Sequence, residues 1–200
     1  MTTRRRLTPG ERRRLLVEAG AELFAAQPYE SVLMEDVAAH AGVSRALLYK
    51  HFPNKRDLFA AVYAVASEGL LAATELDRRT PFLDQLIAGL GAHFDYFAAN
   101  RSAVLAANRT LAGDPVIQAI VTGELAELRR RVIEISGLEG HDRAVLAAVL
   151  TSWLVFVRVL VVDWLANDSV TRDELNDICV GAARGALGDL LEKIEHNRLL

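Results

Sequence analysis

The sequence predicts an all-α protein of about nine helices, for three reasons. Apolar residues recur every three or four positions along most of the 200-residue chain, which is the period of a helix with one buried face. Helix-start signals stand before these segments, whereas no segment alternates apolar and polar residues between turn signals as a strand does. The composition, 52% hydrophobic and 24% charged, is typical of a soluble globular protein with a substantial core.

The first three helices are predicted from their caps. Thr8-Pro9-Gly10-Glu11 has the pattern of a capping box with proline at the first helical position, and opens a helix to about residue 26. In residues 34–55, MEDVAAHAGVSRALLYKHFPNK, Val37 lies on the apolar stripe of a short helix and Gly42 suits a turn with positive φ. Ser44 then caps a second short helix that runs to about residue 52. The segment therefore predicts a helix-turn-helix.

The second of these short helices has a face that suits the major groove of DNA. At about 100° per residue, Leu48 and Phe52 share one side of this helix and are expected to pack on the first of the two short helices. The opposite side is exposed and carries cations, a phenol and apolar groups, and such side chains read guanine edges and thymine methyls. The candidate DNA-binding residues on this helix are Arg45, Ala46, Leu47, Tyr49, Lys50 and His51.

A fourth helix begins directly afterwards, with Asn54 as its N-cap and Asp57 three residues later, and is expected to reach about residue 78. Lys55 occupies its first turn, where a cation is unfavourable for the helix dipole. We interpret Lys55 as a phosphate contact, which completes the candidate DNA-binding set.

Many residues between positions 12 and 62 match one known family: Ala19, Leu23, Phe24, Tyr29, Val37-Ala38, Ala41-Gly42-Val43-Ser44, Leu48-Tyr49, His51-Phe52, Lys55 and Leu58. This segment closely resembles the N-terminal domain of the tetracycline-repressor (TetR) family of transcriptional regulators. The resemblance implies a homodimer that binds a pseudo-palindromic operator in double-stranded DNA and usually represses. It also implies a C-terminal domain that senses a small-molecule effector.

Two departures from the family pattern lie before the helix-turn-helix. The family often has Thr or Ser just before the first short helix, where a hydroxyl caps it and touches a phosphate, and this sequence has Val32 and Leu33 instead. Ser31 is expected to take over the capping. The family's glycine before the tyrosine is Pro28 here, which stiffens the turn.

The remaining helices also have readable boundaries. Thr80-Pro81 opens a helix to about residue 98, Asp114-Pro115 opens one that Gly137 ends, and a capping box at 171–174 opens the last one. A shorter helix is expected between residues 101 and 111, and another starts near Asp142. No linker interrupts the chain, so the domain boundary must fall inside the helix that starts at Asn54. We therefore divide the chain into a DNA-binding domain, 1–60, and a ligand-sensing and dimerisation domain, 61–200.

The segment 145–165, VLAAVLTSWLVFVRVLVVDWL, has the length and apolarity of a membrane span. Arg158 and Asp163 would each cost roughly 2.5 to 3.5 kcal/mol at mid-membrane, which about cancels the gain from the aliphatic residues. We therefore interpret it as a helix buried in a soluble protein, without a membrane partner. Three glycines in the last helix favour close approach by another helix. We expect helices at about 142–166 and 171–193 from two subunits to form a four-helix homodimer interface, as the resemblance also implies.

The charge distribution and the cysteine content agree with this interpretation. Residues 1–60 hold ten Lys or Arg against seven Asp or Glu, so the positive charge lies in the DNA-binding half of a chain whose net charge is −3. Arg4, Arg5 and Arg6 are interpreted equally as an arm that touches the DNA backbone or as a charged, disordered terminus. The single cysteine, Cys179, fits a reducing cytoplasm and a packing role.

The C-terminal part supplies candidate ligand-binding residues, because aromatic and polar side chains lie there among many alanines, as in apolar pockets with a few polar groups. Arg158 would suit an anionic or carbonyl-bearing ligand; equally, it would form a salt bridge with an acid on a neighbouring helix. The candidates are Phe94, Tyr96, Asn108, Trp153 and Arg158.

No CxxC, HExxH or GxSxG motif occurs in the sequence, so we expect neither an enzyme nor a bound cofactor or metal. The sequence favours a ligand-responsive, DNA-binding repressor of the cytoplasm. The alternative is a helical small-molecule-binding or interaction protein that does not bind DNA.

Overall fold

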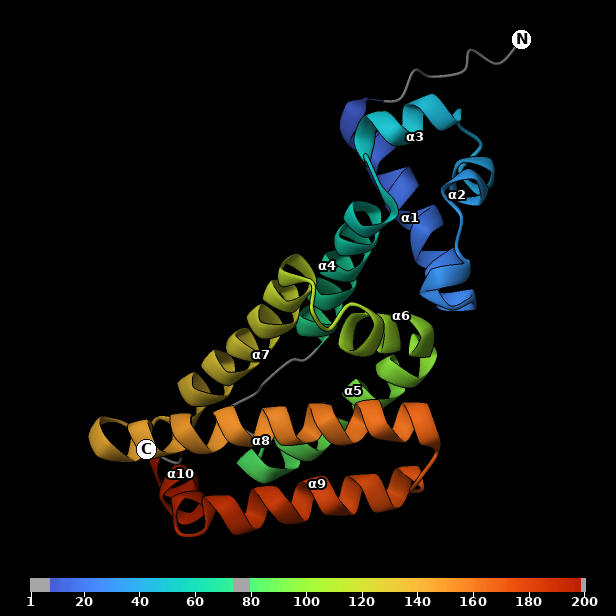
Figure 1. Ribbon diagram of the computed structural model, residues 1–200. Helices are drawn as coiled ribbons and strands as arrows, with labels where there is room; N and C mark the ends of the chain where they lie inside the picture. The colour runs from blue at the N-terminus through green and yellow to red at the C-terminus, as the bar shows by residue number, and fades with distance from the viewer. Residues whose placement is uncertain (1–7, 74–79, 199–200) are drawn as a thin grey trace.

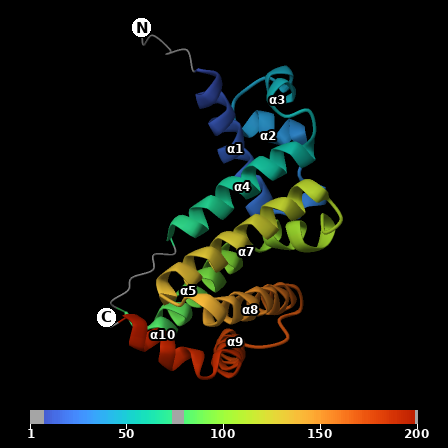
Figure 2. The same cartoon turned by 90° about the vertical axis from the view of Figure 1, so that its left-hand side faces the viewer.

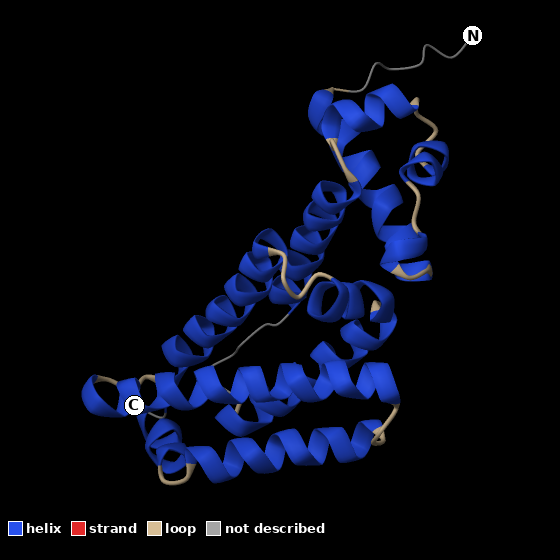
Figure 3. Ribbon diagram, in the orientation of Figure 1, coloured by secondary structure: helices blue, strands red, loops and turns tan. Residues whose placement is uncertain are grey.

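The computed structural model describes residues 8–73 and 80–198, and these residues form α-helices and no strand (Figures 1 and 3). The all-α prediction is confirmed. The first six α-helices are α1 (Pro9–Ala26), α2 (Met34–His40), α3 (Arg45–His51), α4 (Lys55–Ala73), α5 (Phe82–Ala99) and α6 (Arg101–Leu105). They are followed by α7 (Pro115–Ser136), α8 (Gly140–Asn167), α9 (Arg172–Leu187) and α10 (Leu190–Arg198), and two single turns are η1 (Tyr29–Ser31) and η2 (Ala106–Thr110).

Side-chain caps set most of the helix starts that the sequence predicts. The hydroxyl of Thr8 accepts from the backbone N–H of Glu11 in a complete capping box, and Thr171 does the same for α9. Asp114 caps α7 through two backbone N–H groups, and Asn54 accepts from the N–H of Asp57 at the start of α4. Such caps satisfy N–H groups that have no partner inside the helix, and each is worth about 1 kcal/mol.

Three predicted boundaries differ from the structure. The last helix does not run to residue 193, because Gly188 has φ of +47° and ends α9, after which α10 starts a new direction. The segment 101–111 forms α6 followed by the π-type turn η2 instead of one helix. Ser31 does not cap α2, whose N-cap residue is Leu33 without a side-chain hydrogen bond. The predicted end of α4 near residue 78 lies outside the described residues.

The buried side chains form two clusters that meet around α4. One cluster joins α1, α2, α3 and the first half of α4 to η2 and the start of α7, and the other joins α5 and α7–α10 to α6 and the second half of α4. Figures 1 and 2 show α4 and α7 side by side in the middle of the molecule, with α8 and α9 together at the end opposite α3. Gly20 permits the close packing of α1 on α4, since a Cβ there would lie 3.2 Å from Val62 Cγ2.

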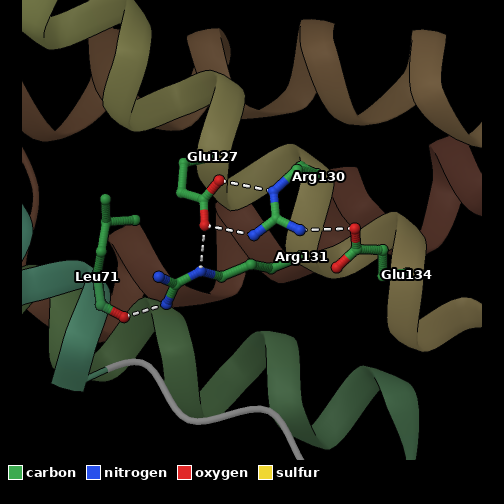
Figure 4. A network of polar contacts seen from close by, with 5 residues as sticks. All are labelled: Leu71, Glu127, Arg130, Arg131 and Glu134. Atoms are coloured by element: carbon green, nitrogen blue, oxygen red, sulfur yellow. Dashed lines mark hydrogen bonds and ion pairs between the residues drawn. The ribbon is translucent and has the colours of Figure 1, made fainter.

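Polar contacts from α7 also hold the far end of α4 (Figure 4). Glu127 accepts hydrogen bonds from the guanidinium groups of Arg130 and Arg131, and these bonds lower its pKa to about 2. Arg130 also pairs with Glu134, and Arg131 donates to the backbone carbonyl of Leu71 on α4. The end of α4 is therefore tied to α7 by a guanidinium that a carboxylate keeps in position.

The apolar helix α8 alone, among the described residues, has the length and composition to cross a membrane. Within the fold, the side chains of Leu146, Leu150, Val157, Val161 and Leu165 are buried in the C-terminal core. Its arginine, Arg158, is also buried and forms an ion pair within the protein. These contacts account for the buried face of α8, whereas Val155, Phe156 and Val159 on another face are exposed.

Candidate nucleic-acid interface

The helix-turn-helix is built from α2, a tight turn and α3, as the sequence predicts. Gly42 has φ of +63°, which only glycine adopts without strain. Ser44 Oγ then accepts from the N–H of Leu47 at 3.2 Å and starts α3. The side chains of Leu48 and Phe52 are buried in the N-terminal core, so the orientation of α3 is fixed.

The opposite face of α3 is exposed at one end of the molecule, remote from α8 and α9 (Figure 1). Four of the candidate residues on this face are exposed, namely Arg45, Ala46, Tyr49 and Lys50, while Leu47 and His51 are half-buried at its edges. We call these six residues the α3 face. A protruding helix with small, cationic and aromatic groups outward has the dimensions and chemistry to enter a major groove.

An ion pair within the protein restricts the conformation of Arg45. Its guanidinium pairs with the carboxylate of Glu35 on α2, and both side chains remain substantially exposed. An exposed pair contributes little to stability. It does restrict the rotamers of an arginine with five hydrogen-bond donors, so Arg45 keeps donors free for a further acceptor.

Lys55 has a different role from the one the sequence suggests. Its ammonium group donates to the carbonyls of Tyr29, Glu30 and Val32 at 2.8, 3.1 and 3.1 Å, and it lies 4.6 Å from the centre of the Tyr29 ring. An ammonium group has three donors, and all three are used inside the protein. Lys55 therefore joins the η1 turn to α4 and has no donor left for a phosphate.

We expect Lys55→Met to lower the stability of the protein and Lys50→Met to leave it nearly unchanged. The first change leaves three carbonyls without their charged donor, at a cost of about 1 to 3 kcal/mol. The second makes the same chemical change on the exposed α3 face. Urea unfolding measures both midpoints. A Lys55→Met midpoint equal to that of the natural protein would contradict the structural role of Lys55.

The structure adds Arg13 to the basic residues around α3. Arg13 lies on α1, is exposed, and its guanidinium stacks 5.1 Å from the ring centre of Phe52, which follows α3. In the sequence, only the run of arginines at 12–14 pointed to a basic group here. The run does not identify Arg13 as a neighbour of α3, because their proximity depends on how α1 packs across the helix-turn-helix.

The candidate ligand-binding residues do not gather in one place. Trp153 and Arg158 line the same cavity between α5, α7 and α8. Tyr96 lines a separate crevice between α1, α4, α5 and α6, Phe94 is fully buried in the core, and Asn108 lies in η2. Asn108 is still within reach of the site, because its carbonyl oxygen lies 3.5 Å from Nη1 of Arg158.

Sequence reasoning did not select the α5 residues of this cavity, Gln85, Leu86, Leu90 and His93. Their helical spacing signals only a buried face and does not reveal which part of that face borders a cavity. In the described residues 8–73 and 80–198, no three His, Cys, Asp or Glu side chains gather as a metal site would require.

Comparison with known proteins identifies the helix-turn-helix part. The family model described as bacterial regulatory proteins, tetR family, matches residues 16–62. The chain is 28% identical over 190 residues to the HTH-type transcriptional activator FasR of Mycolicibacterium smegmatis, covering 91% of this chain and 85% of the relative. It is 32% identical over 72 residues to the HTH-type transcriptional regulator AcrR of Shigella flexneri, covering 36% and 33%.

Solved structures have the same fold. A crystal structure of a TetR-family transcriptional regulator from Streptomyces coelicolor superposes with a TM-score of 0.81 at 22% identity, covering 96% of this chain and 90% of that one. The helix-turn-helix, the family match over it and the relative that spans nearly the whole chain agree. This chain is a DNA-binding transcriptional regulator, and its residues 16–62 carry the helix-turn-helix of the tetR family of bacterial regulatory proteins.

Proposed function

We propose that this regulator binds a pseudo-palindromic operator as a homodimer, with one α3 in each of two successive major grooves, and represses transcription until a small molecule releases it. The exposed α3 face carries this proposal. Arg45 and Lys50 read bases, Ala46 permits close approach, Leu47 meets a thymine methyl, and Tyr49 contacts the backbone. His51 and Arg13 add phosphate contacts at the edges.

The positions of these residues assign DNA binding and ligand sensing to different parts of the chain. We assign residues 1–60 to DNA binding and residues 61–200 to ligand sensing and dimerisation. In this proposal α4 belongs to both parts, because its first half packs in the N-terminal core and Leu70 in its second half lies in the C-terminal core. The protein acts where the DNA is, in the cytoplasm, and no catalytic step is part of the proposal.

The homodimer interface is assigned to one face of α8 and α9. Along α8 the exposed residues on this face are spaced by three or four and are small or apolar: Ala144, Ala148, Ser152, Val155, Phe156 and Val159. On α9 the same face carries Ile178, Gly181, Gly185 and Ala186. A Cβ added at Gly181 or Gly185 would meet no atom within 4 Å, so these positions are open to a second chain.

This face has the properties of a buried interface that lacks its partner. Val159 is 63% exposed and Phe156 is 39% exposed, which is uncommon for large apolar residues placed side by side on a helix. A groove between α8 and α9, lined by Val149, Phe156 and Ala182 among others, can receive side chains of the partner. Two copies would pack α8 and α9 as four helices around a two-fold axis.

We expect Val159→Glu to convert the dimer into a monomer, because two copies of the new carboxylate would be buried close to the two-fold axis without cations. Sedimentation equilibrium at micromolar protein measures the change. Val116→Glu, the same substitution at an exposed valine of α7, is the control and should remain dimeric. A natural protein that sediments as a monomer at this concentration would contradict the assigned interface.

Ligand control is proposed to act through α4. At the start of α4, Lys55 is hydrogen-bonded to η1, which precedes the helix-turn-helix. Farther along α4, the hydroxyl of Tyr63 accepts from Arg158, which lines the cavity between α5, α7 and α8. A ligand that shifts α4 changes the separation of the two α3 helices. Half-sites lie about 34 to 36 Å apart or a multiple of this spacing, so a dimer out of register loses contacts on one side.

Selection from random duplexes tests the proposal as a whole. The full-length protein should enrich an inverted repeat whose half-site spacing matches the distance between the two α3 helices. The affinity for the recovered site should fall steeply with salt, as expected for phosphate contacts. Failure to enrich any sequence at low salt would overturn the assignment of the α3 face.

A further inference from the structure

The cavity between α5, α7 and α8 is almost entirely apolar. It leaves about 70 Å³ for the centres of water molecules, and its walls include Leu86, Leu90, Leu125 and Trp153. A single buried water needs only about 10 to 15 Å³, so the cavity is larger than a site for one water. Trp153 presents its ring, because its N–H already donates to the carbonyl of Cys179 at 2.9 Å.

The charged group that lines the cavity is Arg158, which also joins the surrounding helices. Its Nη2 donates to Glu124 on α7 at 2.6 Å, and its Nη1 lies 3.3 Å from the hydroxyl of Tyr63 on α4. Its guanidinium also stacks 5.2 Å from the ring centre of Phe97 on α5. One side chain thus contacts α4, α5 and α7 from α8.

One donor of this arginine is unused. Nε of Arg158 is buried, and among the described residues it is the only buried side-chain nitrogen or oxygen without a hydrogen-bond partner. A buried donor left unpaired costs about 1 to 3 kcal/mol, and more when it belongs to a charged group. Arg158 lines the apolar cavity and keeps one buried hydrogen bond unmade, so an acceptor oxygen of a ligand that enters beside its side chain would complete the set.

The charge of the site is already balanced. Arg158 and Glu124 are both buried, with side-chain exposures of 7% and 2%, and they form an ion pair. His93 is neutral, because burial and the positive charge of Arg158 lower its pKa to about 3. A bound carboxylate would add an uncompensated negative charge to an apolar cavity, and an amine would add a positive one, and either is costly.

We propose that this cavity binds a small, uncharged, mainly apolar carbonyl compound, such as a ketone, ester or amide, whose oxygen accepts the hydrogen bond from Nε of Arg158. The inference deepens the proposed ligand control, and rests on it only for the claim that binding affects DNA. An oxygen at Nε satisfies the donor without changing the net charge, while the apolar part of the ligand contacts Leu86, Leu90 and the Trp153 ring.

Isothermal titration calorimetry with three probes of equal chain length tests the ligand class on the full-length protein. 2-Hexanone should bind, and hexanoate and hexylamine should bind at least about tenfold more weakly. Tighter binding of hexanoate would overturn the choice of an uncharged ligand. Equal affinity for all three probes, or no binding of 2-hexanone at millimolar concentration, would overturn the proposal.

Two variants locate the site. Glu124→Gln combined with Arg158→Met removes the donor without leaving a buried charge, and should weaken 2-hexanone binding by about tenfold or more. Leu125→Phe keeps Arg158 but fills the cavity, and should also weaken binding. Unchanged 2-hexanone affinity in both folded variants would overturn the site. Because the titrations contain no DNA, their failure leaves the duplex selection unaffected, and the two proposals fail separately.

Discussion

Ala46→Glu should abolish operator binding while the protein stays folded. Ala46 is exposed at the centre of the α3 face, where the proposed geometry brings the helix backbone close to the bases. A glutamate there is too long for this approach and sets a carboxylate against an anionic duplex. Like-charge contacts of this kind cost several kcal/mol. A cost of about 3 kcal/mol corresponds to about a 100-fold higher Kd.

The measurement is fluorescence anisotropy with the duplex recovered by selection. Ala126→Glu introduces the same charge at an exposed alanine of α7, so it reproduces the change in net charge without touching α3. We expect this control to bind within about twofold of the natural protein, since long-range charge effects are screened beyond about 10 Å. If Ala46→Glu bound as tightly as Ala126→Glu, α3 would not be the groove-facing helix.

Local signals made most of the fold predictable. Thr8, Ser44, Asp114 and Thr171 each cap a helix with their own side chain, so a few neighbouring residues determine each start. The exposed residues of the α3 face could also be predicted from local signals. Burial of Leu48 fixes which side of the helix is exposed, and helical geometry then places the remaining side chains.

Features that depend on contacts between residues far apart in the sequence were harder to predict. The acceptors of Lys55 are backbone carbonyls 23 to 26 residues earlier, and no side-chain pattern reveals them. Glycines in the last helix were read as packing surfaces; Gly181 and Gly185 are open to a partner, whereas Gly188 ends the helix. The difference lies in backbone conformation, which the residue type alone does not specify. Likewise, the sequence left Arg158 with two interpretations because its partner Glu124 is 34 residues away.

That ion pair carries the largest stability effect that we expect. In Arg158→Met, Glu124 remains buried without its cation, and breaking a buried pair in this way costs about 3 to 5 kcal/mol. For a chain of this length, each kcal/mol corresponds to about 2 to 4 °C in Tm, so Tm should fall by about 6 to 20 °C. Adding Glu124→Gln should restore most of the loss, because no charge is then buried and the new amide can keep the hydrogen bond with Ser67.

The pH dependence distinguishes this explanation from simple loss of packing. Burial raises the pKa of Glu124 above its ordinary value of 4.5, and Arg158 is the main opposing influence, so Arg158→Met should raise that pKa further. A carboxyl group with a raised pKa in the folded state favours folding at low pH, and this contribution is lost as the pH rises through that pKa. The Tm deficit of Arg158→Met relative to the double variant should therefore grow as the pH rises from 4.5, the ordinary pKa of this carboxyl group, toward neutrality. A deficit that stays constant over this interval would mean that lost packing around the arginine, and not an unpaired carboxylate, destabilises the variant.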